Sequence, residues 1–292
     1  MLDFWDRLEL TLIRQVTHLD YPCTLIIYVK AAYEIFKDAA IYYAKTTIPD
    51  TLESLDNLDY AVVPRENSIF GPVIETFDWL RSFEKGSIQG EIVLKIQHCL
   101  VVRKGMHLED IECIMSHEQA LGQCRKFIAK NLPNSAISKT TSTAAAAETV
   151  SRSTTLNVAA ICSKVCVTMF EGLDLIKEGI QDEDSNYTRF FLVGKDSQHK
   201  LPTYPVHPTH ALIRVTPTSL EMPVNLLALL KTIDVPIIRI DRRPSLSSLP
   251  FSDTYFLELN TSSDSPSWSQ QVERTLWKIR DIGFSAEKIG TW

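Results

Sequence analysis

The sequence predicts an α/β protein, in which a layered domain of alternating strands and helices precedes a small α+β ferredoxin-like domain. Three observations carry this prediction. The chain has 292 residues, a length that suits two domains of about 100–200 residues each. Short apolar runs alternate with amphipathic stretches up to residue 193, which is typical of a layered domain with a largely parallel sheet. The remainder has the order β-α-β-β-α-β, the ferredoxin-like arrangement.

The first domain is expected to alternate regularly between the two kinds of element. Helices are predicted over residues 2–16, 31–36, 71–80, 118–131 and from residue 163. Strands are predicted over residues 24–29, 59–63, 91–102, 111–115, 157–161 and 187–193, where apolar and β-branched residues gather. The strand at 59–63 is expected to stop at Pro64.

The character of the chain changes at residues 195–210, which hold three prolines and many polar residues without periodicity. We therefore expect a linker there. In the second domain, strands are predicted over residues 211–215, 236–240, 254–259 and 283–289, and helices over 223–230 and 270–279.

Composition limits the function classes. Hydrophobic residues make up 45 % of the chain and charged residues 23 %, as in ordinary soluble proteins. The net charge of -6 argues against a nucleic-acid partner, although a local pocket can still be positive and hold an anion. The start of the chain lacks the features of a secretory signal, and no apolar run approaches the ~20 residues that span a bilayer. We expect a cytoplasmic protein with no membrane partner.

The six cysteines and seven histidines show no metal-ligating spacing. Cys162 and Cys166, the closest pair, are expected to be buried as small hydrophobic side chains in a reducing compartment. A nucleophile elbow and a phosphate loop are also missing from the sequence. We therefore expect no metal and no cofactor.

Polar residues at the ends of predicted strands are the first candidates for a site. Glu66, Asn67 and Ser68 follow a buried strand, and ligands of open α/β sheets bind at such strand ends. The alternative is an ordinary turn in which the asparagine bonds to nearby backbone groups. Thr188 and Arg189 open a later strand, where adjacent side chains point to opposite faces. One can face a cleft, or both can be ordinary surface residues.

Two predicted helix starts are further candidates. Ser116 with Gln119 fits a capping box around His117, and Ser142 and Thr143 precede a run of alanines. Helix N-termini attract anions, but each of these segments is equally compatible with a plain helix cap.

Taken together and in order, these segments resemble the motif set of prephenate dehydratases. The motifs are VVPRENS, GEIVLKIQHCL, SHEQALGQC, TSTAAAA, AAICSK and NYTRF. Near the C-terminus, IDRRPS resembles the Glu-Ser-Arg-Pro motif of the family's ACT domain, and LWKIRDIGFSAEKIGTW resembles that domain's last helix and strand. The resemblance covers roughly residues 48–292.

The resemblance implies a two-lobed catalytic domain similar to type 2 periplasmic binding proteins, with the substrate between the lobes. This domain would span residues 1–194, with lobe 1 at about 1–81 and 180–194 and lobe 2 at about 82–179. The linker at 195–210 and an ACT regulatory domain at 211–292 would follow. The family acts in phenylalanine biosynthesis, so feedback inhibition by L-phenylalanine and a homodimer or homotetramer are also implied.

The implied reaction converts prephenate to phenylpyruvate with loss of water and carbon dioxide, and it needs no cofactor. Thr188 matches the family's essential threonine, which acts as a positioned hydrogen-bond donor to the departing hydroxyl oxygen. Substrate contacts are implied for Glu66, Asn67, Ser68, His117, Gln119, Ser142, Thr143, Arg189 and Phe190.

Two motifs depart from the family pattern. The family begins with a Gly-Pro-x-Gly-Thr-Phe-Ser loop before its first helix, whereas this chain has no glycine before Gly71. The ACT domain's two phenylalanine-binding motifs are also altered. The implied ligand positions are Pro223, Val224, Asn225 and Leu226 in place of Gly-Ala-Leu-Val, and Asp241, Arg242, Arg243 and Pro244 in place of Glu-Ser-Arg-Pro.

Three alternatives to the prephenate lyase remain. The chain can be a catalytically impaired relative that senses prephenate or an aromatic amino acid, which the missing glycine loop favours. It can act on arogenate, which carries an amino group in place of the keto oxygen. A plain solute-binding protein is the least favoured, because no export signal is present.

Overall fold

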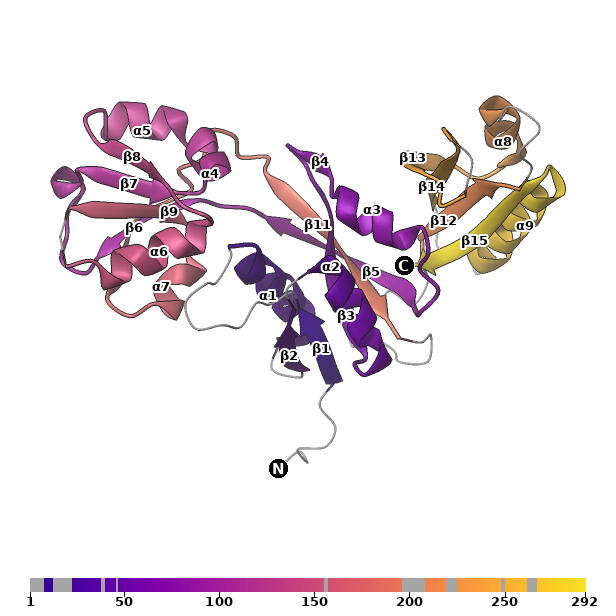
Figure 1. Cartoon of the computed structure of the whole chain (residues 1–292), viewed down its shortest axis with the longest axis horizontal. Helices are drawn as coiled ribbons and strands as arrows, with labels where there is room; N and C mark the ends of the chain where they lie inside the picture. Colours follow the sequence, from indigo (N-terminus) through magenta and orange to yellow (C-terminus); the bar gives the residue numbers. More distant parts are fainter. Residues whose placement is uncertain are drawn as a thin grey trace.

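A computed structural model describes residues 8–12, 23–37, 40–45, 47–154, 157–195, 208–218, 225–247, 250–261 and 267–292. These residues form three bodies in a row (Figure 1). We call them lobe 1, in the middle of the view, lobe 2, in pink, and the C-terminal unit, which comprises the elements from β12 onward. In the described residues, no helix is both long and apolar enough to cross a membrane.

Lobe 1 is a mixed sheet with helices on both faces. Its strands are β1 (Leu8–Leu12), β2 (Ala40–Ala44), β3 (Tyr60–Asn67), β4 (Gly71–Pro72), β5 (Ser87–Lys95) and β11 (Tyr187–Gly194). The order is β5-β11-β3-β1-β2, with β1 parallel to both neighbours and β11 antiparallel to both of its own. Its helices are α1 (Cys23–Phe36), α2 (Ile48–Glu53) and α3 (Ile74–Leu80), with a 3-10 turn at Ser54–Asp56.

Two ring contacts place the helices of lobe 1. Phe36 of α1 lies 5.3 Å from Tyr60, whereas Phe77 of α3 lies 6.5 Å from Phe191. Gly194 is the register partner of Tyr60, so Phe191, three positions earlier on β11, points to the other face of the sheet. Helices α1 and α3 therefore cover opposite faces, and the core of lobe 1 lies between each helix and the sheet.

Lobe 2 is a second mixed sheet, of order β10-β6-β9-β7-β8. Its strands are β6 (Cys99–Arg103), β7 (Cys113–Ser116), β8 (Ala136–Lys139), β9 (Val158–Cys162) and β10 (Leu173–Glu178). Its helices are α4 (Glu118–Gln123), α5 (Arg125–Asn131), α6 (Thr143–Arg152) and α7 (Val165–Met169), with a 3-10 turn at Leu108–Asp110. Two segments connect the lobes, at residues 96–98 and 179–186 (Figure 1).

The C-terminal unit has the predicted ferredoxin-like order. Its elements are β12 (His210–Pro217), α8 (Leu226–Thr232), β13 (Ile237–Pro244), β14 (Asp253–Asn260), α9 (Trp268–Asp281) and β15 (Phe284–Thr291). The four strands are antiparallel in the order β13-β14-β12-β15. β15 continues the sheet of lobe 1 through one pairing, Gly290 with Ile88. A Cβ at Gly290 would lie 2.1 Å from the Ile88 carbonyl oxygen, so this approach requires glycine.

The predictions for the N-terminal region were wrong. Residues 2–16 were expected to be helical, but Leu8–Leu12 form strand β1. Residues 24–29 were expected to be a strand, but they belong to a single helix, α1, that continues to Phe36. A short apolar run does not distinguish a helix from a buried strand, and β1 is defined by its pairing with two strands that come later in the chain. The rest of residues 2–16 lies outside the described residues.

Several other boundaries also differ. Strand β3 does not stop at Pro64 but continues to Asn67. The strand expected over residues 91–102 is two strands, β5 and β6, because the chain crosses between the lobes. Strand β5 thus lies in lobe 1, within the range 82–179 that was expected for lobe 2. The helix expected over 118–131 is interrupted at Cys124, and the one expected over 71–80 begins at Ile74. Elements β2, α2, β8 and β10 were not predicted, and both sheets are mixed rather than largely parallel.

Candidate active site

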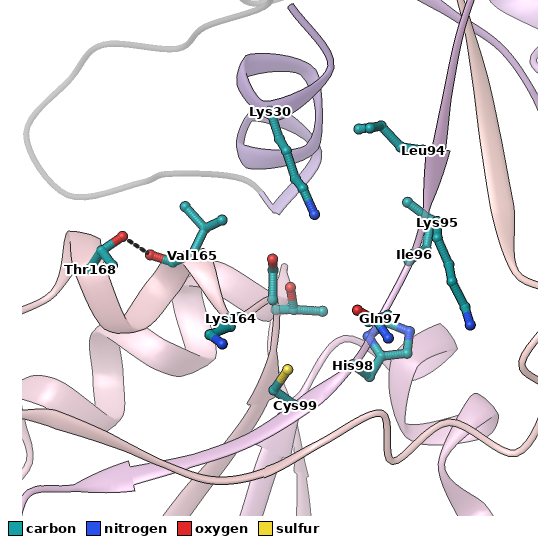
Figure 2. Close-up of a pocket in the computed structure, with 12 residues that line it drawn as sticks. Lys30, Leu94, Lys95, Ile96, Gln97, His98, Cys99, Lys164, Val165 and Thr168 are labelled. Carbon is teal, nitrogen blue, oxygen red and sulfur yellow. Dashed lines mark hydrogen bonds between the residues drawn. The ribbon is translucent and has the colours of Figure 1, made fainter. Parts of the chain in front are cut away.

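A pocket with a volume of about 300 Å³ lies between the two lobes (Figure 2). Lobe 1 contributes one residue of α1 and the end of β5, and lobe 2 contributes the starts of α6 and α7. The segment that joins β5 to β6 forms the wall between them. The lining residues are Lys30, Leu94, Lys95, Ile96, Gln97, His98, Cys99, Thr143, Ser163, Lys164, Val165 and Thr168.

The pocket is basic although the chain is acidic overall. Three lysines and a histidine line it, and its lining includes no aspartate or glutamate. Lys164 is paired with Glu178 at 2.6 Å, and Lys95 approaches Asp184 at 3.8 Å. Lys30 has no hydrogen-bond or ion-pair partner within the described part of the chain, and its amine extends from α1 toward the pocket (Figure 2). Such a lining favours an anionic ligand.

Thr188 lies on the sheet face that borders this pocket. It stands directly opposite Leu94 on β5 and Asn67 on β3, so the three side chains share one face. Leu94 lines the pocket. The amide nitrogen of Asn67 donates a hydrogen bond of 3.0 Å to Thr188 Oγ1. Because the threonine oxygen accepts this bond, its own proton stays available for another acceptor.

Asn67 is held in one orientation. Its Oδ1 accepts hydrogen bonds from the backbone N–H groups of Ile69 at 2.9 Å and Phe70 at 3.2 Å. Its Nδ2 therefore points to the start of β11, where Oδ1 of the preceding residue, Asn186, lies 2.8 Å away. Ser68 adds a second hydrogen bond between the end of β3 and the segment before β11, because its hydroxyl donates to the Ser185 carbonyl at 2.7 Å.

Hydrogen bonds continue from this pair into lobe 2. Asn186 Nδ2 donates to Gln123 Oε1 at 3.2 Å, and Gln123 Oε1 lies 2.6 Å from His98 Nε2. Burial lowers the pKa of His98, with the Gln123 bond as the smaller, opposing cause. Neutral His98 can donate its Nε2 proton to Gln123. A continuous series of polar contacts thus joins the lobe 1 pair to the pocket wall.

Sequence reasoning did not single out these linking residues. His98, Gln123 and Asn186 all lie within quoted motifs, GEIVLKIQHCL, SHEQALGQC and NYTRF. A polar residue at the end of an apolar strand was the available signal for His98.

Two helix starts of lobe 2 hold the remaining polar candidates. Ser142 caps α6, as predicted, by accepting from the Ala145 N–H at 3.0 Å, and Thr143 lines the pocket. The cap predicted at Ser116 is wrong. Its hydroxyl is buried and donates to the Ile161 carbonyl, whereas His117 caps α4 by accepting from the Gln119 N–H at 3.3 Å.

Among the predicted catalytic and substrate-contact residues, Thr143 alone is in the pocket lining. Glu66, Arg189 and Phe190 make their contacts elsewhere. Arg189 points to the opposite face of the sheet from Thr188, where its Nε pairs with Glu66 at 2.8 Å. Glu66 is 8 % exposed and also pairs with Arg239 of the C-terminal unit. Phe190 is fully buried in the core of lobe 1. Glu66 and Arg189 therefore support the Thr188 strand from behind, whereas Phe190, two positions along β11, lies in the core on the same face as Thr188.

Arg65 joins lobe 1 to the C-terminal unit. Its guanidinium is fully buried and pairs with Glu258 of β14 and, at 2.7 Å, with Glu91 of β5. Burial is the largest single influence on the pKa of Arg65 and opposes its charge, but the bonds and charges of Glu258 and Glu91 together raise that pKa. Arg65 therefore stays charged in the interior.

The residues predicted to bind an amino acid lie at β13 and at the start of α8. Asn225 caps α8 by accepting from the Ala228 N–H at 3.0 Å, and Leu226 is exposed beside it. Asp241 pairs with Arg239, and Arg242 with Asp253. Arg243 makes a two-point contact with Asp78 of α3, at 2.7 and 2.9 Å. Pro244 ends β13, and Pro223 and Val224 lie outside the described residues.

Comparison with known proteins agrees with the motifs. The prephenate dehydratase family model matches residues 28–198. The chain belongs to the prephenate dehydratase family. The prephenate dehydratase of Lactococcus lactis is 31 % identical over 260 residues, which cover 86 % of this chain and 88 % of the relative. The bifunctional chorismate mutase/prephenate dehydratase of Escherichia coli K12 is 29 % identical over 234 residues, 80 % of this chain. This match spans only 58 % of the bifunctional enzyme.

Solved structures show the same fold. The prephenate dehydratase of Arthrobacter aurescens, in complex with L-Phe, has a TM-score of 0.76 and 26 % identity over 97 % of this chain and 88 % of that one. The Staphylococcus aureus enzyme has a TM-score of 0.74 at 20 % identity, over 98 % of this chain and 99 % of that one. The predicted α/β fold is confirmed. A quorum-quenching acylase, GqqA, also shares it, with a TM-score of 0.71 and 20 % identity over 98 % of this chain and 97 % of that one, so function has to be argued from the site.

The segment between β1 and α1 comprises residues 13–22. Residues 13–22 contain no glycine and lie outside the described residues. The family match begins after them, within α1.

Proposed function

We propose that this chain is a lyase that converts prephenate to phenylpyruvate, with loss of water and carbon dioxide. The observation that carries the proposal is the hydrogen bond from Asn67 to Thr188 Oγ1. This bond leaves a threonine proton free on the sheet face beside a basic pocket between the lobes.

The reaction needs a donor rather than a strong acid. The bond between the ring carbon and the carboxylate breaks, and its electron pair enters the ring as carbon dioxide leaves. The bond to the ring hydroxyl breaks at the opposite side of the ring, and the departing hydroxide takes up one proton from the solvent to become water. A hydrogen bond from Thr188 to that oxygen stabilises the charge that develops on it. Removal of water from around the ring carboxylate favours its loss.

The pocket matches the substrate's charge. Prephenate carries two carboxylates, and Lys30, Lys95 and Lys164 surround a space near the lower end of the size range of small-molecule sites. Thr143 at the start of α6 adds backbone donors and the positive end of the helix dipole. We assign one carboxylate to this helix start and Lys30, whose amine has no competing partner in the described residues.

The remaining predicted contacts divide into two groups. We propose that Ser68, His117, Gln119 and Ser142, which are not in the pocket lining, order the edges of the cleft. Glu66 and Arg189 act indirectly, because their side chains lie behind the Thr188 strand. Phe190 also acts indirectly, because it is fully buried in the core of lobe 1.

The C-terminal unit is proposed to be an ACT domain that binds L-phenylalanine and reports its level to the catalytic lobes. The complex of the Arthrobacter aurescens relative with L-Phe supports this. The proposed ligand positions stay Pro223, Val224, Asn225, Leu226, Asp241, Arg242, Arg243 and Pro244. Of these, Asp241, Arg242 and Arg243 already pair with Arg239, Asp253 and Asp78. Titration calorimetry that detects no phenylalanine binding to the folded protein would remove the proposal. The linker at 195–210, a homodimer or homotetramer and a cytoplasmic location stay predictions.

The test is turnover. Purified protein is incubated with prephenate at neutral pH, and phenylpyruvate is followed by its absorbance in alkali. We expect turnover in the wild type and a loss of about 100- to 1000-fold in Thr188→Ala, the typical cost of one transition-state donor. A folded wild type that turns over arogenate instead would change the substrate. Binding of prephenate without turnover of either compound would establish the sensor alternative.

A further inference from the structure

A β-bulge lies directly beside the proposed catalytic pair. Along β3 and β11, Phe190 faces Pro64 and Arg189 faces Glu66, so Arg65 has no partner of its own in the ladder. A bulge changes which face the following side chains occupy. Arg65 and Glu66, although consecutive, both turn toward the C-terminal unit. The side chain of Asn67 then lies on the face that borders the pocket, directly across from Thr188 on the neighbouring strand.

Arg65 and Glu66 are both held by charged side chains of the C-terminal unit. Arg65 pairs with Glu258 of β14, and its guanidinium lies 5.0 Å from the centre of the Phe191 ring. Glu66 pairs with Arg239 of β13. Arg239 is itself fixed by Asp241 at 2.7 Å. The bulge is therefore clamped from the side of the sheet away from the pocket.

We propose that the C-terminal unit, through Arg239 and Glu258, holds this bulge and thereby positions Asn67 against Thr188. The proposal rests on the proposed function for the role of Thr188, and it makes Arg239 a positioning residue. Without the bulge, a one-residue slip would move Asn67 to the other face of the sheet. Without Glu258 and Arg239, the adjacent buried charges of Arg65 and Glu66 would each lose a counter-charge, which destabilises that conformation.

The clamp also gives the C-terminal unit a direct route to the active site. Movement of β13 or β14 relative to lobe 1 would displace the bulge directly, because Arg239 and Glu258 pair with its residues. Arg239 lies far from Asn67 in the sequence, but its side chain pairs with Glu66, the residue immediately before Asn67.

The variant that tests the clamp is Arg239→Gln, with Arg81→Gln as the matched control. Arg81 donates to the Pro244 carbonyl at 2.8 Å, across the same junction but away from the bulge. We expect kcat to fall about tenfold in Arg239→Gln, with KM within twofold, because the loss affects transition-state contacts. Arg239→Lys should recover part of the lost kcat, and Arg81→Gln should keep wild-type kcat.

A double-mutant cycle separates positioning from general damage. If Arg239 acts through Asn67, then Arg239→Gln causes no further loss of kcat in an Asn67→Ala background. Independent losses that multiply would overturn the proposal, and so would an unchanged kcat in Arg239→Gln or an equal loss in Arg81→Gln.

A second readout needs no substrate. The amides of Ile69 and Phe70 are bonded to Asn67 Oδ1, so their hydrogen exchange should be several-fold faster in Arg239→Gln and unchanged in Arg81→Gln. If the wild type does not turn over prephenate, the proposed function fails, and these exchange rates alone decide the clamp. Equal rates in the wild type and Arg239→Gln would refute it.

Discussion

Asn67 and Thr188 face each other across β3 and β11, with the asparagine amide nitrogen 3.0 Å from the threonine oxygen. The asparagine carbonyl is occupied by two backbone N–H groups, so the direction of this bond is fixed. The threonine accepts from Asn67 and can donate only elsewhere. This arrangement makes a neutral hydroxyl useful as a donor in the cleft.

Replacing Asn67 with aspartate should reverse the bond. A carboxylate at this position would accept the Thr188 proton and withdraw it from the substrate. We expect Asn67→Asp to lose about 100- to 1000-fold in kcat, as for loss of the donor itself. Asn67→Ala should lose only about tenfold, the scale of one supporting hydrogen bond.

Steady-state kinetics with prephenate measures both variants. Asn131→Asp is the control, because Asn131 is exposed on α5 and its amide bonds to the Phe127 carbonyl. It makes the same chemical change outside the cleft and should keep wild-type kcat. Asn67→Asp as active as Asn67→Ala would show that the direction of the bond does not matter.

Much of the C-terminal unit could be predicted from the sequence, because alternating strands and an amphipathic α9 are local patterns. Lobe 1 was harder. Pro64 was expected to end its strand, but it is tolerated because it lies at a bulge, where proline is permitted. Nothing local in the sequence marks that bulge, because it depends on Glu258 and Arg239, which lie about 170 to 190 positions further along the chain.

The site shows the same division. Asn67 and Thr188 were predicted from their motifs, and the structure brings them together. The hydrogen-bonded connection through Asn186, Gln123 and His98 was not predicted, because it joins residues from two lobes and depends on their packing. The alternation of Thr188 and Arg189 was predictable, since it follows from strand geometry alone.

Lys30 should contribute to binding rather than to chemistry. We expect Lys30→Gln to raise KM about tenfold with kcat within twofold, because a charge contact to a carboxylate acts equally in the ground and transition states. Added salt should raise KM more in the wild type than in Lys30→Gln, since screening acts on this same contact.

Lys104→Gln is the matched control, because Lys104 is exposed and lies outside the pocket lining. It removes the same charge from the chain and should leave KM unchanged. An equal rise of KM in both variants would assign the effect to net charge instead of to Lys30.

Arg65 should be costly to remove alone and much less costly to remove with its partner. Arg65→Met leaves Glu258, which is 1 % exposed, without its counter-charge. We expect the free energy of unfolding to fall by about 3–5 kcal/mol. In Arg65→Met with Glu258→Met, most of that loss should be recovered, because two apolar side chains replace two buried charges.

Urea unfolding measures these changes. The exposed pair Lys85 and Asp56, at 2.7 Å, supplies the comparison. Lys85→Met should cost less than about 1 kcal/mol, as exposed ion pairs usually do. A double variant less stable than Arg65→Met would mean that Glu258 is satisfied without Arg65.

His98 should make the stability of the protein depend on pH. Burial lowers its pKa in the folded state below the ordinary value of 6.5. Above about pH 6.5 the histidine is neutral in both states, so it adds no slope. Between that pH and the lower folded pKa, only the unfolded state binds the proton, so the free energy of unfolding falls as the pH falls, by at most about 1.4 kcal/mol per pH unit.

Urea midpoints at pH 7.5 and 5.5, compared between the wild type and His98→Gln, isolate this contribution, because all other groups titrate in both proteins. Glutamine can still donate to Gln123 but does not titrate, so the decrease toward pH 5.5 should be smaller in the variant. If the two proteins lose the same stability, His98 is either exposed to water or able to carry its proton in the folded state. The hydrogen bond of 2.6 Å to Gln123 would then be made by a charged imidazole at pH 5.5, and the series of contacts between the lobes would carry a positive charge below about pH 6.5.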